Sequence, residues 1–138
     1  MENQSVASSP SIARTGIVIV VLHFLVTIAH GTAHQNLHIT MNAWQSVYIM
    51  LIIFLLPLIS AVLLLRKRTR IGFWLLFASM LGSLLFGGYY HFVAAGADNV
   101  ASLGAHDWAP VFQITAALLA LTETAGTVTG FVGLRHEG

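Results

Sequence analysis

Histidine side chains recur along one side of the first apolar segment of this chain, at His23, His30, His34 and His38. On an α-helix these positions, together with Thr27, fall within an arc of about 80° at about 100° per residue. His30 and His34 are four residues apart, so their imidazoles lie on adjacent turns of one face. This spacing is typical of helical metal sites. Because Gly31 and not Glu follows His30, the pair does not indicate a zinc protease.

A third metal ligand must come from another segment, and His91 and Glu123 are the candidates. Two histidines with one carboxylate suit non-haem iron, whereas three histidines suit copper or zinc. The sequence has no cysteine, so a thiolate site is excluded. A di-iron site is disfavoured because such bundles use several glutamates. We therefore expect metal ligands among His30, His34, His91 and Glu123.

Haem b is the competing cofactor, with His34 and His91 as its axial ligands. The two histidines are expected on different helices at a similar depth, and Gly31, Gly87 and Gly88 nearby would leave space for a flat macrocycle. Ligation by histidine on both faces would favour electron transfer over oxygen binding. From the sequence alone, a haem and a histidine-bound metal both remain open.

Glu123 lies inside the last apolar segment. A carboxylate near the middle of a bilayer costs about 2.5 kcal/mol or more, so it is normally turned inward and paired. Counting 1.5 Å per helical residue places Glu123 between the depths of His23 and His30. His23 is the expected partner. The same residues would also suit a proton or small-solute conduit.

The elements that must position these side chains are four membrane-spanning helices. The chain has 138 residues, of which 57% are hydrophobic and 8% charged, against about 25% charged in soluble domains. Four apolar segments are each long enough to cross about 30 Å of hydrocarbon: about 15–37, 44–65, 71–93 and 109–134. We predict one all-α domain over residues 1–138, an up-down-up-down bundle in which residues 1–10 form a flexible tail.

All six basic residues lie at one end of this bundle: Arg14, Arg66, Lys67, Arg68, Arg70 and Arg135. By the positive-inside rule, both termini are cytoplasmic. The distribution of basic residues therefore indicates which end of the bundle faces the cytoplasm, and it does not indicate nucleic-acid binding. A cleavable signal peptide ending before His34 is the alternative for the first segment. The histidine pattern runs through that cleavage point, so we favour a retained span.

Local signals mark the second span and the last. Asn42 is a suitable N-cap for the second helix, and Pro57 is expected to bend it because proline lacks a backbone donor. Gly126 and Gly130 form a G-x-x-x-G pair that permits close approach of a neighbouring helix. The depth count also places Gln113 level with His34 and His91.

Three function classes follow from these observations. The first is a membrane protein that binds haem b or a copper, iron or zinc ion near the outer face, with a redox or ligand-handling role. The second is a non-catalytic accessory subunit of a larger membrane complex; as protein partners, a homo-oligomer or such a complex is expected. The third is the conduit built on Glu123 and the histidines. We expect the lipid bilayer as partner and the inner membrane of a bacterium or archaeon as location.

Overall fold

Helices make up nearly all of the computed structural model, which describes residues 9–137. Their order is α1 (Ser9–Asn36), α2 (Ala43–Tyr48), the π-helical segment η1 (Ile49–Leu55), α3 (Leu56–Leu65), α4 (Thr69–Gly88), the π-helical segment η2 (Tyr89–Val93) and α5 (Ala109–Glu137). Four continuous helical stretches are long and apolar enough to cross a membrane: Pro10–Asn36, Ala43–Leu65, Thr69–Val93 and Ala109–Glu137. The predicted apolar segments are thus confirmed as helices.

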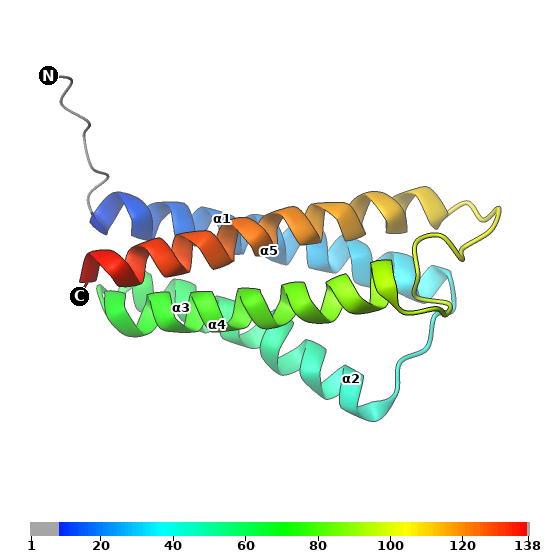
Figure 1. Cartoon of the computed structure of the whole chain (residues 1–138), viewed down its shortest axis with the longest axis horizontal. Helices are drawn as coiled ribbons and strands as arrows, with labels where there is room; N and C mark the ends of the chain where they lie inside the picture. The colour runs from blue at the N-terminus through cyan, green and yellow to red at the C-terminus, as the bar shows by residue number, and fades with distance from the viewer. Residues whose placement is uncertain (1–8, 138) are drawn as a thin grey trace, which may run out of the picture.

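Both ends of the described chain are found at one end of the molecule (Figure 1). The first helix begins six residues before the predicted span, at Ser9. Of the predicted tail, residues 1–8 lie outside the described residues, and Ser9 and Pro10 belong to α1. Helix α5 packs against both α1 and α4, whereas α2 leans away from the other helices at the opposite end (Figure 1).

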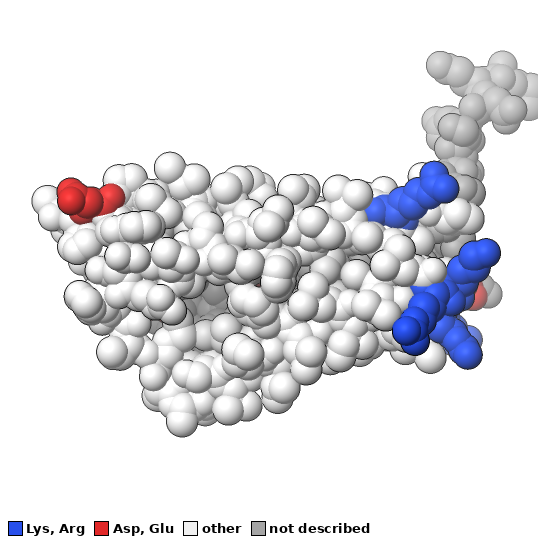
Figure 2. Space-filling view, turned by 180° about the vertical axis from the view of Figure 1, so that it is seen from behind, with Lys and Arg blue, Asp and Glu red and all other residues white. Residues whose placement is uncertain are grey.

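Charge separates the two ends of the molecule. Figure 2 shows lysine and arginine gathered at one end with acidic atoms beside them, further acidic side chains at the other end, and an almost uncharged surface between the two ends. Large apolar side chains are exposed along this length, among them Leu25, Leu85 and Leu121, each more than half exposed. A surface of this kind is expected against hydrocarbon and not against water.

The second membrane-length helix changes its winding midway. Asn42 caps it as predicted, since its side chain accepts from Gln45 N and Gln45 accepts from Asn42 N in a reciprocal capping box. Just before Pro57, where the sequence predicts a bend, residues Ile49–Leu55 are wound as the π-helical turns of η1. A widened π turn inserts an extra residue per hydrogen-bonded ring, which alters the direction of the side chains around it.

Apolar packing fills the basic half of the bundle. Its core includes Val20, Leu64, Phe73, Leu76 and Met80. Close contact between α4 and α5 depends on glycines of α5: a Cβ built on Gly130 would lie 2.6 Å from the backbone nitrogen of Phe77. The opposite half of the bundle buries histidine, threonine and glutamate side chains instead.

Candidate metal centre

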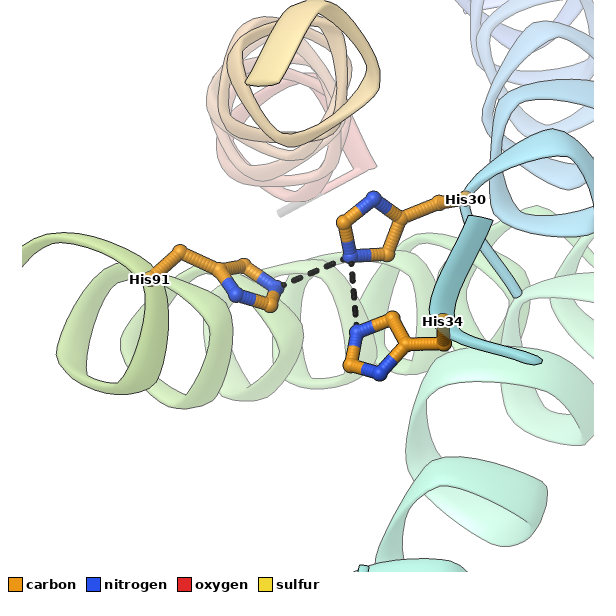
Figure 3. Close-up of side chains that lie close together, drawn as sticks. All are labelled: His30, His34 and His91. Atoms are coloured by element: carbon orange, nitrogen blue, oxygen red, sulfur yellow. Dashed lines mark hydrogen bonds between the residues drawn. The ribbon is translucent and has the colours of Figure 1, made fainter. Parts of the chain in front are cut away.

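Three imidazoles meet between α1 and α4 in the polar half of the bundle. His30 Nε2 lies 3.2 Å from His34 Nε2 and 3.2 Å from His91 Nε2. One nitrogen of each ring lies within 4.8 Å of the other two. The three residues are 5% to 7% exposed. Figure 3 shows the rings pointing toward one another, two from α1 and one from η2, which directly continues α4.

The local winding of two helices produces this convergence. His30 and His34 share one face of α1 because they are four residues apart. His91 lies in η2, where Ala94 N donates across a π turn to Tyr89 O at 2.7 Å. Such π turns often occur at functional sites, because they redirect a side chain without ending the helix.

The outer nitrogens of two rings are held by hydrogen-bond acceptors. His30 Nδ1 lies 2.9 Å from Thr115 Oγ1, while the Thr115 hydroxyl itself donates to Val111 O at 2.7 Å. The hydroxyl therefore accepts from His30 Nδ1–H. His91 Nδ1 faces the Asp98 backbone carbonyl at 3.1 Å and Asp98 Oδ1 at 3.2 Å, and both oxygens are acceptors. These partners assign the ring proton to Nδ1 in both histidines.

This tautomer assignment directs lone pairs into the centre of the cluster. When both rings are neutral, His30 Nε2 and His91 Nε2 face one another as two acceptors. His34 adds a third nitrogen there: its Nε2 lies 3.1 Å from Asp98 Oδ1, which only accepts, and its buried Nδ1 has no hydrogen-bond partner, so its ring proton lies on Nε2. Three nitrogens thus converge with one ring proton between them, and a metal ion that binds all three would displace that proton to His34 Nδ1. Metal-bound histidines characteristically donate their other ring N–H to a carbonyl, carboxylate or similar acceptor, as His30 and His91 do here.

Asp98 brings a negative charge beside the cluster from the loop between η2 and α5. Its Oδ1 lies 3.1 Å from His34 Nε2. Burial by itself raises the pKa of the Asp98 carboxyl, but the interactions with His34 and His91 outweigh burial and hold that pKa well below its usual range. The loop is fastened by Val100, whose N–H donates to His91 O at 3.0 Å. Asp98 is therefore an ionised carboxylate that attracts a cation.

Phe112 of α5 covers the cluster on one side. Its ring centroid lies 4.6 Å from that of His30, 5.0 Å from that of His34 and 5.3 Å from that of His91, and the residue is fully buried. Such close packing limits ring rotation and excludes water. The three imidazoles are consequently fixed in their mutual positions before any ion is bound.

Glu123 and His23 form a separate buried pair at the next level of the bundle. Glu123 Oε1 lies 3.4 Å from His23 Nε2, and the side chains are 4% and 1% exposed. The structure thus brings Glu123 to His23 and not into the group of three imidazoles, although Glu123 lines the same cavity as those imidazoles. The remaining span histidine, His38, follows the end of α1 and has a φ of 54°.

Sequence reasoning did not assign Asp98, Thr115 or Phe112 to the site. Asp98 lies in a loop that has acidic but no basic residues, and threonine and phenylalanine are common in apolar helices. Gln113, expected at the depth of the histidines, is exposed and donates to Val100 O at 2.8 Å, so it fastens the loop. No pattern in the sequence distinguishes a residue that supports a ligand from one that packs.

Comparison with protein-family models, with curated proteins and with solved structures finds no match to this chain. The chemistry of the cluster therefore has to be argued from its own geometry. What that geometry establishes is a helical protein with membrane-length helices and a buried group of three histidines that could hold a metal ion.

Proposed function

We propose that this protein is an integral membrane protein that binds one transition-metal ion through His30, His34 and His91. The single observation that carries the proposal is the convergence of three buried Nε2 atoms, two of them 3.2 Å from the third. Nitrogens bound at about 2.0–2.1 Å to one tetrahedral ion stand about 3.3–3.4 Å apart. The two 3.2 Å separations are close to that spacing, and all three nitrogens lie within 4.8 Å of one another.

The donor set favours copper, zinc or iron as the metal. All three expected ligands are imidazoles, which suit these ions, and the sequence has no cysteine thiolate. Copper is the strongest competitor for a nitrogen site among the divalent ions of the first row. With three protein ligands, a fourth coordination position stays open, as it does in catalytic metal sites. An open position is what a redox or ligand-handling role requires.

Haem b receives less support from the same geometry. Two axial nitrogens, each about 2 Å from the iron, must stand about 4 Å apart on opposite faces of a macrocycle. A haem iron ligated by His34 and His91 would have to lie between their Nε2 atoms. That space is obstructed by His30, whose Nε2 lies 3.2 Å from both of them. A macrocycle would have to displace His30 and its bond to Thr115.

We further place both chain termini in the cytoplasm, so that the metal centre lies near the outer face of the membrane. Support comes from the positive-inside rule, since both ends of the described chain, residues 9–137, lie at the basic end of the molecule and the cluster lies in the other half. A cytoplasmic membrane of a bacterium or archaeon would give this orientation. Lipid is the partner proposed for the exposed apolar flanks.

Elemental analysis of the purified protein tests the proposal. After purification in detergent and dialysis against copper, zinc or ferrous iron, one ion per chain should be retained. His91→Ala should abolish retention because it removes one of three ligands. His136→Ala is the matched control, since this histidine is exposed at the opposite end of the molecule and should not alter metal content.

Three results would overturn the assignment. A protein that retains no metal under any of these conditions would leave the cluster as a set of hydrogen-bonded histidines sharing a proton. A bound porphyrin with a Soret band would point to haem b. Metal retained equally by wild type and His91→Ala would locate the ion elsewhere. A folded, monodisperse protein that binds metal alone would also count against a purely accessory role in a larger complex.

A further inference from the structure

A cavity of about 100 Å³ lies directly against the three imidazoles. Its remaining wall is mostly apolar and includes Ile53, Phe54, Phe86 and Leu119. Phe112 is not part of this wall, so it covers the cluster from another side. The open coordination position of a metal held by the imidazoles is therefore available on the cavity side.

The cavity has its mouth on the apolar flank of the bundle. Among the residues that line it, Gly31 of α1 is exposed and Phe92 of η2 is 48% exposed. A Cβ built on Gly31 or on Gly88 meets no atom within 4 Å, so both glycines border open space. Figure 1 shows α2 leaning away from the other helices. A molecule would enter from the hydrocarbon and not from water.

Size and charge restrict what this cavity can admit. At about 30 Å³ per water molecule, 100 Å³ holds about three such molecules, whereas a cavity that binds benzene has about 150 Å³. An aromatic head group is therefore too large. Most of the cavity wall is apolar and offers no hydration to an ion of either sign, so a charged molecule is disfavoured. A small uncharged molecule satisfies both conditions.

We propose that the cavity delivers an uncharged diatomic molecule, of the class of dioxygen, nitric oxide or carbon monoxide, from the bilayer to the open position on the metal. This inference rests on the proposed metal centre and names its ligand class. Apolar gases are more soluble in hydrocarbon than in water, because transfer of an apolar solute out of water is favourable. A mouth that opens toward the lipid would therefore admit the gas from the phase in which its concentration is higher.

Carbon monoxide binding to the cuprous protein in lipid nanodiscs tests this proposal. One C–O stretching band per bound copper is expected in the infrared spectrum. Gly31→Phe places a ring at the mouth, where the structure has open space, and should slow rebinding after flash photolysis by about tenfold or more without loss of copper. Gly88→Leu blocks the same cavity from α4 and provides a second, independent variant.

Thr32→Phe is the matched control. Thr32 is exposed and adjacent to Gly31 on α1, but it does not line the cavity, so its rebinding rate should equal that of wild type. Copper that is bound but gives no C–O band would overturn the proposal while leaving the metal centre intact. Rebinding that is unchanged in both Gly31→Phe and Gly88→Leu would overturn the lateral route. Failure of the wild-type protein to retain copper, zinc or iron would instead overturn the metal centre itself.

Discussion

Thr115→Val should weaken metal binding without disturbing the fold. Valine has nearly the shape of threonine but cannot accept the hydrogen bond that His30 Nδ1–H makes to Thr115 Oγ1 at 2.9 Å. In the metal-free protein, His30 can move its proton to Nε2 and donate to a neighbouring imidazole. When metal occupies Nε2, the proton must stay on Nδ1, where it has lost its partner. The penalty therefore falls on the metal-bound state.

The size of this effect follows from burial. His30 is 6% exposed and Thr115 7% exposed, so water cannot readily replace the lost acceptor. An unpaired buried N–H costs about 1–3 kcal/mol, which corresponds to a dissociation constant about 5- to 140-fold larger. Competition with a chelator of known affinity, followed for Cu(I) or Zn(II), measures that ratio directly.

Two control variants isolate the hydrogen bond. Thr115→Ser keeps the hydroxyl acceptor and should bind metal about as tightly as wild type. Thr122→Val, also in α5, removes a hydroxyl that bonds only to the Leu118 and Leu119 carbonyls of its own helix, so it should leave affinity unchanged. If Thr115→Val binds within about twofold of wild type, the tautomer argument is wrong and Thr115 is only a packing residue.

Three further substitutions test other parts of the structure. Asp98→Asn removes the charge beside two imidazoles and should weaken metal affinity by about 10- to 100-fold in the same competition assay; unchanged affinity would contradict its supporting role. His23→Leu strands the Glu123 carboxylate, so thermal unfolding in detergent should show a loss of about 3–5 kcal/mol, recovered largely by adding Glu123→Leu. Failure of the double variant to recover would refute the pairing. Gly130→Val should lower the midpoint of thermal unfolding, because its Cβ would lie 2.6 Å from the α4 backbone. Gly31→Ala is the control and should leave the midpoint unchanged, because its Cβ meets no atom within 4 Å. Equal midpoints for the two variants would contradict the close packing of α4 and α5.

The sequence by itself determined the helices and the adjacency of two of the three histidines in the cluster. Hydrophobic runs of membrane length locate helices reliably, because hydrocarbon leaves the backbone no other hydrogen-bond partners than its own. The adjacency of His30 and His34 follows from their spacing alone, because four residues make about one helical turn. The pairing of Glu123 with a span histidine was foreseen from the cost of burying its charge.

Only the tertiary structure decided which side chains complete the site. The choice of His91 over Glu123 as the third member of the cluster depends on how the helices are rotated and on the π turn of η2, which a count at 1.5 Å per residue does not contain. Asp98 reaches the cluster through the path of a loop, and Thr115 through the contact of α5 with α1. Packing between helices is set by complementary shapes across the whole interface, so it cannot be derived from the spacing of residues along one helix.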